Sequence, residues 1–530
     1  MNQIVGALKM ISQIDELKKL LEPKISELGL DEGTIEEILS KAMDFSEKEL
    51  KPHSMKWDEN GTHFEKVYKI RIRSKNENVE LGENEYNILD KYGCIEEAVL
   101  TRRRLLFPEY FEEVQKRLGK TGLLGLYIPK EYGGLGLPYT LYSCVIEILS
   151  GGDANFGVHA SIHGTAADLI NRFGTEALKN RLLPDMASGK KLGCLVFTEG
   201  SGGSDLKAVS TASELAGDGY IINGNKFSIT SGAYADVHVV FTVDKEDYHL
   251  PFADRKKYNA LVVEKGTEGL ELLGIGNTMG WRASPTSMLK FENCKVSVEN
   301  LLGERGSGRK VLSAGLSGGR ISFGCAWSLG IADAAYRKAM ERSEKRILFG
   351  KPLKDHREIR KHLADMYRYL CMGRQKYIHA AYLKDKNDPD FPFEATISKI
   401  FCSERAEDIV RIVYQMHGHF GYINESGVPL LFRNVMVATV GEGGTEVLRD
   451  RVVAPGVING DYAFTGEIEY DRSYVDRNLG DEIFRELAQR LGDDVYPCYE
   501  ILVSRATGRK IRMPATEVKN LTINWKLYGL

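Results

Sequence analysis

Apolar residues in the first third of the chain recur at helical spacing. They fall at i, i+3 and i+4 over 14–21 and again over 35–42. The same period returns over 107–120, 141–150 and 166–186. A charged segment interrupts it, and its short alternating runs around a Ser-Lys-Asn-Glu-Asn turn are typical of two strands. The pattern predicts an N-terminal helical domain over 1–190 with an insertion near 62–104.

The pattern changes in the middle of the chain. After residue 190, short β-branched and aromatic runs broken by Gly, Asn and Asp follow one another without helical repeats, which predicts a central β-barrel or sandwich over 191–308. Long amphipathic stretches then predict a helical bundle over 309–455. The remaining residues, 456–530, mix one helical stretch (481–491) with two strand-like runs (499–504 and 510–513). We expect a multidomain α+β protein with a C-terminal α+β extension of unknown role.

Composition and charge exclude several classes of protein. The 530 residues include 43% hydrophobic ones, enough for several cores, and 71 basic against 74 acidic side chains give a net charge of −3. No basic stretch indicates nucleic-acid binding. No window reaches the ~18 apolar residues of a membrane helix, and the N-terminal residues lack the features of a signal or transit peptide. We therefore expect a soluble, cytoplasmic protein without a membrane span.

The eight cysteines are scattered and form no C-x-x-C pair. This spacing is typical of reduced, mostly buried thiols, and we expect neither disulfides nor a metal site.

A glycine-rich loop with hydroxyl side chains follows an apolar run. It reads FTEGSGGSDL over 197–206, so backbone amides could approach a ligand closely while Thr198 and Ser204 donate hydrogen bonds. Taken alone, it could equally be an exposed Gly/Ser turn.

Eight further segments, in order with this loop, give the sequence a specific resemblance to the acyl-CoA dehydrogenase family. The segments are Gly122–Pro138, Arg172–Lys190, Gly217–Thr230, Gly280–Ser284, Asn300–Gly308, Phe349–Leu353, Gln415–Tyr422 and Gly441–Val447. The resemblance implies a helical domain, a β-domain and a four-helix bundle. It also implies FAD-dependent oxidation of an acyl-CoA thioester to a trans-2-enoyl-CoA. The insertion and the extension lie outside it.

This reaction determines which chemical groups the active site must contain. Removing hydrogens from Cα and Cβ of a thioester requires a base, a hydride acceptor and donors to the carbonyl oxygen. No side chain accepts a hydride, so a flavin must. The resemblance places the base at Glu442, nine positions after Arg433, and desolvation there should raise its pKa. The alternative base position of the family is Gly319, which has no carboxylate.

The resemblance also assigns the remaining ligand contacts. The FAD contacts are Phe197, Thr198, Gly203, Ser204, Ser228, Ile229, Thr230, Arg346, Phe349, Arg357, Gln415, Gly418, His419, Gly444 and Glu446. The substrate contacts are Ser204, Ser317, Arg320, Gly441 and Gly443. Arg346 and Phe349 should reach the FAD of a neighbouring subunit, which implies a homodimer or homotetramer. Arg320 could instead be a surface residue at a helix end, and His419 an ordinary loop histidine.

Several positions depart from the family pattern. Ser228 replaces the usual Trp beside the flavin, Gly200 a Pro, Arg357 a Gln and Gly444 a Thr. The Trp lies near the route to electron-transferring flavoprotein, the expected partner. Its loss leaves open an acyl-CoA oxidase or flavin monooxygenase of the same superfamily. A flavin-bound member that only binds a partner is a third alternative.

Four positions bear on the substrate pocket. Gly441 stands where straight-chain members often have Tyr, so the sequence favours a branched or bulky acyl group. Gly157 aligns with the Arg that binds a distal carboxylate, which argues against a decarboxylating dicarboxylyl enzyme. His159 and His163 could reach the pocket or be buried structural residues.

Overall fold

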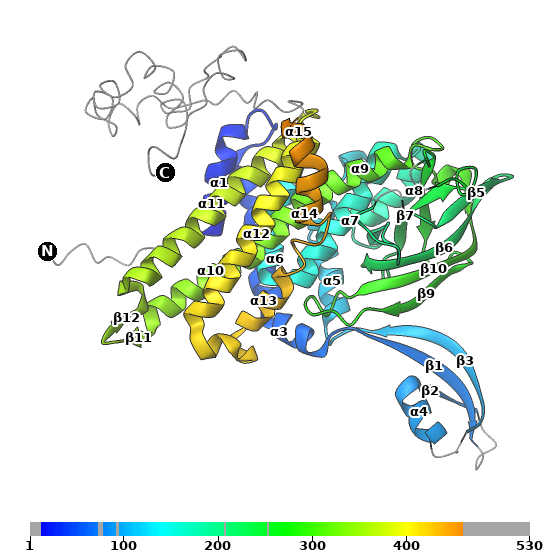
Figure 1. The fold of residues 1–530 in the computed structure, drawn as a ribbon, viewed down its shortest axis with the longest axis horizontal. Helices are drawn as coiled ribbons and strands as arrows, with labels where there is room; N and C mark the ends of the chain where they lie inside the picture. The colour runs from blue at the N-terminus through cyan, green and yellow to red at the C-terminus, as the bar shows by residue number, and fades with distance from the viewer. Residues whose placement is uncertain (1–11, 73–77, 92–94, 206–207, 252–253, 459–530) are drawn as a thin grey trace. The chain divides into compact units, whose positions relative to one another are not determined.

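The computed structural model describes residues 12–72, 78–91, 95–205, 208–251 and 254–458 (Figure 1). The chain divides into a unit of 1–453 and a unit of 454–530. Only α15 (Ala454–Ile458) is described in the second unit, so the helix and strands predicted beyond it lie outside the described residues.

The first part of the chain is helical, as predicted. Ser12 and Asp31 accept hydrogen bonds from the first turns of two of its helices, and Asp153 does the same for the long buried helix that follows α6. The helices are α1 (Gln13–Leu21), α2 (Glu32–Phe45), α3 (Lys51–Asn60), α5 (Phe111–Lys120), α6 (Tyr139–Gly152), α7 (Ala154–Phe173) and α8 (Glu176–Ala187), with a π-helical turn, η2 (Ser46–Leu50), before α3.

The insertion forms a sheet of its own, in the order β2-β1-β3. Its elements are β1 (His63–Ile72), β2 (Asn78–Gly82), α4 (Glu83–Lys91) and β3 (Ile95–Leu106). Two strands were expected, and the third strand and the helix add to them. Thr62, at the base of the insertion, is anchored to the main body: its N–H donates to the Arg282 carbonyl at 2.9 Å and its hydroxyl to the Ala283 carbonyl at 2.8 Å.

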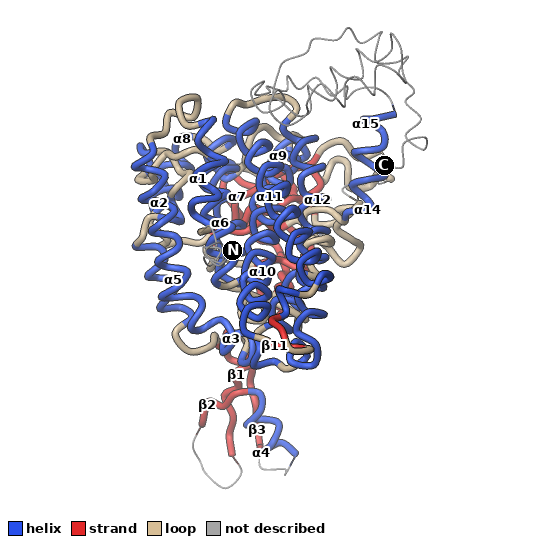
Figure 2. Tube along the Cα trace, turned by 90° about the vertical axis from the view of Figure 1, so that its left-hand side faces the viewer, coloured by secondary structure: helices blue, strands red, loops and turns tan. Residues whose placement is uncertain are grey.

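The predicted β-domain is a single seven-stranded sheet in the order β4-β7-β5-β6-β10-β9, with β8 paired to β7. All eight residues of β7 are buried because helices cover it, and α7 and α9 both contact it. Figure 2 shows helices lying in front of these strands. The strands are β4 (Gly193–Val196), β5 (Ala212–Ala216), β6 (Gly219–Thr230), β7 (Val237–Asp244), β8 (Tyr258–Glu264), β9 (Leu270–Ile275) and β10 (Thr286–Ser297).

The predicted helical bundle follows. Its long helices α10, α11 and α12 pack on one another, and α10 and α11 also contact α6. The elements are α9 (Gly308–Gly319), the π-helical η6 (Arg320–Trp327), α10 (Ser328–Lys345), β11 (Ile347–Leu348), β12 (Lys351–Pro352), α11 (Arg357–Asp385), α12 (Phe391–His417), η8 (Gly418–Tyr422), α13 (Val428–Val435), α14 (Thr445–Leu448) and η10 (Arg449–Val453).

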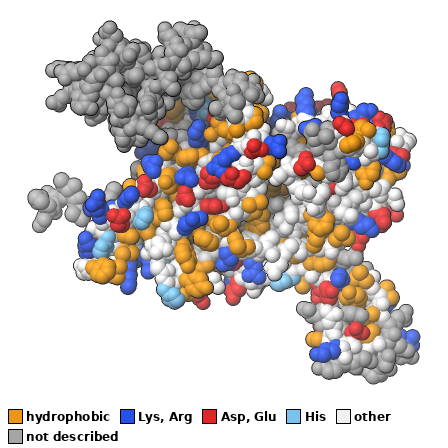
Figure 3. Space-filling model, viewed as in Figure 1, with side chains coloured by type: hydrophobic (Ala, Val, Ile, Leu, Met, Phe, Trp, Pro, Cys, Tyr) orange, Lys and Arg blue, Asp and Glu red, His pale blue; other side chains and the backbone are white. Residues whose placement is uncertain are grey.

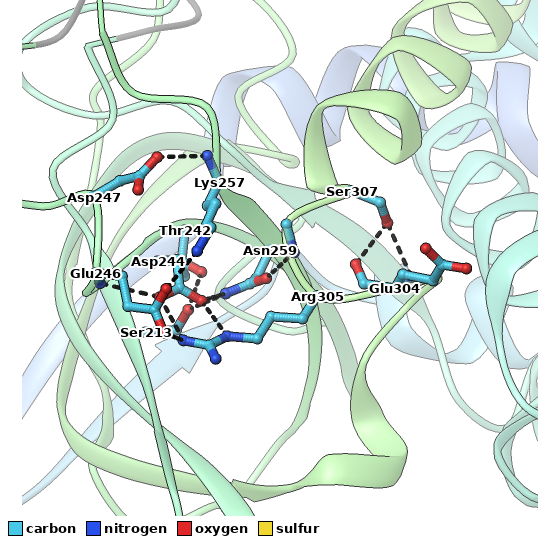
Figure 4. Close-up of polar contacts among 11 residues, drawn as sticks. Ser213, Thr242, Asp244, Glu246, Asp247, Lys257, Asn259, Glu304, Arg305 and Ser307 are labelled. Carbon is cyan, nitrogen blue, oxygen red and sulfur yellow. Dashed lines mark hydrogen bonds and ion pairs between the residues drawn. The ribbon is translucent and has the colours of Figure 1, made fainter.

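Two polar clusters join these parts. Arg305, in the loop before α9, makes two hydrogen bonds to Asp244 at the end of β7, at 2.7 and 2.9 Å, and one to Glu246 (Figure 4). Asn259 on β8 donates to the same Asp244 and accepts from the Gly306 N–H. These contacts hold the loop that leads into the helical bundle against the β-domain.

The second cluster lies inside the helices. Arg374 on α11 is buried and donates to Glu147 of α6 at 2.6 Å and to Asp333 of α10 at 2.7 Å, and it also pairs with Glu16 of α1. A buried cation needs such partners. The cluster therefore ties the N-terminal helices to the bundle.

Three expectations from the sequence can be compared with the described residues. Six of the eight cysteines lie there; all six are unpaired and five are buried. No described helix is long and apolar enough to cross a membrane. The described residues include no group of three or more His, Cys, Asp or Glu that could bind a metal.

Candidate active site

Glu442 lies in the loop between α13 and α14, in a conformation that side chains rarely adopt. Its φ is +54°, and the following Gly443 has φ +94°. Such a backbone persists only where the surroundings enforce it. Lys399 of α12 provides this restraint: its buried Nζ donates to the carbonyls of Thr439 at 3.1 Å and Gly443 at 2.7 Å, on both sides of Glu442.

The carboxylate of Glu442 lies against the end of α9. A Cβ atom on Gly319 would lie 2.7 Å from the carboxylate carbon, so the missing side chain leaves the space that Glu442 uses. The next residue, Arg320, is half-buried rather than on the surface. Its Nε approaches the Glu442 carbonyl at 3.4 Å, and its Nη1 donates to the Thr396 hydroxyl at 3.0 Å. Two segments more than a hundred residues apart thus meet at this point.

The surroundings of Glu442 shift the pKa of its carboxylate. Part of the Glu442 surface stays accessible, but the carboxylate is surrounded by protein atoms, and this burial raises its pKa to about 7 although Arg320 and Lys399 act in the opposite direction. Burial also lowers the pKa of Lys399 to about 8. A carboxylate with a pKa near neutrality is suited to remove a weakly acidic proton.

The space beside Gly441 is occupied by an aromatic ring. A Cβ atom there would lie 2.4 Å from the Phe323 ring of η6, so that ring fills the space a larger residue at 441 would use. Phe323 packs on Trp327 (4.8 Å between ring centroids) and on Trp281 (5.7 Å), and all three are buried. Gly441 therefore does not open a wide pocket. Ser317, another predicted substrate residue, is buried one turn before Phe323's helix begins.

The glycine-rich loop is held from beneath by a buried ion pair. Lys226 of β6 is fully buried and donates to the Phe197 carbonyl at 2.9 Å, the Phe241 carbonyl at 2.7 Å and Glu199 at 2.9 Å. Glu199 in turn accepts the Thr211 N–H at 2.9 Å. This pair fixes the loop on the sheet. Lys226 lies in the matched segment Gly217–Thr230, but its partner could not be recognised from sequence.

The loop and the end of β6 come together as predicted for a flavin site. The Phe227 N–H donates to the Thr198 carbonyl at 2.9 Å, and Ile229 is buried beside it in the same strand. A Cβ atom on Gly203 would lie 3.2 Å from the Thr198 hydroxyl oxygen, so the loop folds tightly back on itself. Thr198 and Ser204 from the loop and Thr230 from the strand are thus placed in neighbouring segments. This set of backbone and hydroxyl donors fits a flavin ring.

Ser228 sits at a β-bulge. Lys226 pairs with Leu289 and Ile229 with Ser287, so two residues of β6 oppose one of β10, and Ser228 has φ +54°. The preceding residue, Phe227, directs its ring toward the loop, 3.6 Å from the Cβ position of Gly200. An aromatic ring therefore remains next to the loop although the Trp is absent.

The other predicted FAD residues lie on the surface, in other elements. Arg346 ends α10, and Phe349, 89% exposed, is at the tip of the β11–β12 hairpin. Apolar side chains gather there, at the lower left of Figure 3. The rest are exposed or partly exposed: Arg357, Gln415, Gly418, His419, Gly444 and Glu446. Glu446 pairs with Arg449 at 2.6 Å. Gly444 and Glu446 lie in or directly after the Glu442 loop, whereas one chain does not bring the others to it.

The two histidines near the pocket are buried structural residues. His159 hydrogen-bonds the hydroxyls of Ser284 and Tyr234, and burial lowers its pKa to about 3. His163 accepts the Gly193 N–H at 3.2 Å. Both are therefore neutral.

Comparison with known proteins identifies the family of the chain. Models of the acyl-CoA dehydrogenase N-terminal, middle and C-terminal domains match residues 95–190, 194–294 and 306–455. The short-chain specific acyl-CoA dehydrogenase of Clostridium acetobutylicum is 34% identical over 63% of this chain and 86% of its own length.

Two solved structures are similar as well. Butyryl-CoA dehydrogenase from Megasphaera elsdenii superposes with a TM-score of 0.67 at 29% identity, covering 80% of this chain and 97% of that one. A chain from the structural study of the electron transferring flavoprotein of Acidaminococcus fermentans gives 0.68 at 29% identity with the same coverage. The chain therefore belongs to the acyl-CoA dehydrogenase family of FAD-dependent oxidoreductases.

Proposed function

We propose that this protein oxidises a short, unbranched acyl-CoA to the trans-2-enoyl-CoA, with Glu442 as the base that removes the α-proton. The observation that carries the proposal is the Glu442 carboxylate itself. It is desolvated and has a pKa of about 7. It lies against Gly319 at the end of α9, and Lys399 holds the backbone next to it. A base in this state is deprotonated in a large fraction of molecules at neutral pH, yet retains enough basicity for the α-proton.

The backbone next to the base supplies a donor for the thioester. Among the described residues no acceptor takes the Glu442 N–H, whereas the Gly441 and Thr445 N–H groups are both bonded within the loop. We infer that this N–H donates to the thioester carbonyl oxygen as negative charge develops on it. Arg320, half-buried beside the same loop, supplies a positive charge toward the CoA side.

The flavin site follows from the glycine-rich loop and the end of β6. Thr198, Ser204 and Thr230 would donate to the ring, and Phe197 and Ile229 would pack against it. FAD bound there supplies the acceptor for the hydride that leaves Cβ. The residues of this chain orient the thioester and accept the proton at the Glu442 carboxylate.

The size of the acyl group is set by aromatic residues. Because the Phe323 ring occupies the space beside Gly441, the wall next to the base is filled in spite of the glycine. The similar proteins, a short-chain specific acyl-CoA dehydrogenase and a butyryl-CoA dehydrogenase, support the same substrate class. We propose a straight chain of about four carbons in place of the branched group inferred from Gly441 alone.

Assembly and electron transfer complete the proposal. Ile347 (62%), Leu348 (39%) and Phe349 (89%) are exposed together at the β11–β12 hairpin, which supports a homo-oligomer that covers them. The similarity to the chain from the electron transferring flavoprotein study supports such a flavoprotein as the electron acceptor.

A direct experiment separates this function from the alternatives. The purified holoenzyme is mixed anaerobically with butyryl-, isobutyryl-, hexanoyl- and glutaryl-CoA, and flavin bleaching is recorded. Rapid bleaching with butyryl-CoA, and turnover with an electron-transferring flavoprotein but little peroxide in air, is the expected result. Peroxide formation at a competitive rate would indicate an oxidase. An absence of bleaching with every thioester would indicate a member that only binds a partner.

A further inference from the structure

One edge of the sheet in the insertion is a long strand. β3 stands last in the order β2-β1-β3 and pairs antiparallel with β1 along one side (Figure 1). Within the described residues, no strand pairs with its other side. β3 is twelve residues long. An edge of this length offers a row of backbone N–H and C=O groups with which a strand of another chain can pair.

The middle of β3 is apolar and lies at the surface. Ala98 is exposed, and so are Val99 (55%) and Leu100 (38%). Pairing with another strand would remove part of this apolar surface from water, which is favourable. The middle of the edge is therefore suited to contact with a second apolar strand.

Two features that usually protect an edge strand are also present in β3. Single-residue bulges at Glu96 and Thr101 shift its register with β1, and charged residues stand on either side of the apolar middle. Bulges and charges usually hinder edge-to-edge pairing. The bulges, however, leave residues 97–100 in regular register with β1, so the middle of the strand keeps its extended geometry.

The charges of β3 are divided by sign between its two ends. The sequence has acidic residues at 96 and 97 and basic residues at 102–104. When two copies of such a strand lie antiparallel, the acidic end of each meets the basic end of the other, and residues 98–100 meet at the centre. A strand with charges of one sign would instead repel its copy. The pattern is self-complementary and favours a second copy of this chain over an unrelated strand.

We propose that β3 pairs antiparallel with β3 of a second copy, so that the two insertions form one continuous sheet. Such a contact is isologous, because the same surface of both copies meets about a two-fold axis. It uses a surface other than the β11–β12 hairpin. The pairing therefore adds a second contact between copies and goes beyond the proposed function.

Reversal of the charges at one end of β3 tests the proposal. Glu96→Lys with Glu97→Lys makes both ends basic, and Arg102→Glu with Arg103→Glu makes both ends predominantly acidic, so each variant should repel its own copy. In sedimentation of the separate holoenzymes, each should have about half the mass of the wild type. An equimolar mixture of the two variants should regain the wild-type mass, because opposite charges meet again at both ends.

Two further proteins complete the test. Asp90→Lys with Lys91→Glu is the matched control, since it reverses exposed charges on α4, outside β3, and should keep the wild-type mass. A chain without 63–106 should have about half that mass, and this result does not depend on how the charge variants fold. An unchanged mass in the shortened chain, or a mixture of folded charge variants that stays at the lower mass, would overturn the proposal. The edge would then be available to a strand of another protein.

Discussion

Glu442 combines two features that each cost stability: a positive φ and a buried carboxylate. Lys399 offsets part of this cost because it bonds the backbone on both sides of the base. Its charge also favours the ionised carboxylate. We regard Lys399 as a positioning residue, since it touches the loop and not the reacting atoms.

Replacement of Lys399 by Met should test this role. A base must be deprotonated, so kcat/KM of the wild type should rise with pH through about 7 and then level off. Loss of the Lys399 charge removes an effect that lowers the pKa of Glu442, so the rise of kcat/KM with pH should move to higher pH. Loss of the two hydrogen bonds should reduce kcat/KM roughly 10–100-fold at neutral pH. Lys361→Met, on the exposed start of α11, is the control. If the rise of kcat/KM stays at the same pH or moves to lower pH, Lys399 does not have this positioning role.

Phe323 should determine the length and branching of the acyl group. Phe323→Val removes ring atoms beside Gly441, so the ratio of kcat/KM for isovaleryl-CoA to that for butyryl-CoA should rise about tenfold. Phe391→Val, a similar change at the start of α12, accounts for general loss of packing. If the two variants keep the ratio of the wild type, Phe323 is not part of the acyl wall.

At the scale of elements, the continuous segment from α9 through η6 to α10 organises the site. Its π-helical turn begins at Arg320, directly after Gly319, which leaves the space that Glu442 uses, and it places the Phe323 ring beside Gly441. π-Helical turns inside α-helices are frequently found at functional sites. The helical period of the sequence predicted this segment, but an α-helix and a π-helical turn have too similar a pattern of apolar residues to be separated.

The rest of the molecule also contains features that the sequence predicted and features that it did not. The helical and strand periods predicted the three architectural parts, because burial of one face imposes them on the sequence. The bulge at Ser228 and the Lys226–Glu199 pair were not predictable, since they depend on strand register and on contacts between distant segments. The contact of the Phe323 ring with the space beside Gly441 is of the same kind, and Gly441 alone could not reveal it.

The insertion should be dispensable for folding. His63 and Leu106 are paired at its base, so a short turn can join Thr62 to Phe107 without moving either. The ring of Phe107 should be kept, because it packs on Phe111 and Tyr234. A chain without 63–106 should retain FAD, the unfolding midpoint within a few degrees and turnover with butyryl-CoA. Loss of FAD from this otherwise folded chain would show that the insertion takes part in the flavin site.

At the scale of the whole molecule, the exposed hairpin between α10 and α11 is the surface through which we expect copies of the chain to assemble. Phe349→Ala should lower the mass measured by sedimentation or speed FAD loss, because the exposed ring is expected to contact the cofactor of another subunit. Tyr248→Ala, which also removes an exposed ring, should change neither quantity. Unchanged mass and unchanged FAD retention in Phe349→Ala would exclude the hairpin from the interface and from the cofactor site.

The central claim is that Glu442 removes the α-proton, and Glu442→Gln tests it most directly, since it preserves size and removes the base. Wild type and variant holoenzymes, matched for FAD content, are mixed anaerobically with butyryl-CoA in a stopped-flow instrument. The flavin of the wild type should bleach rapidly, and that of the variant on the order of a thousandfold more slowly, the range expected for loss of a general base. Bleaching of both at the same rate would contradict the account.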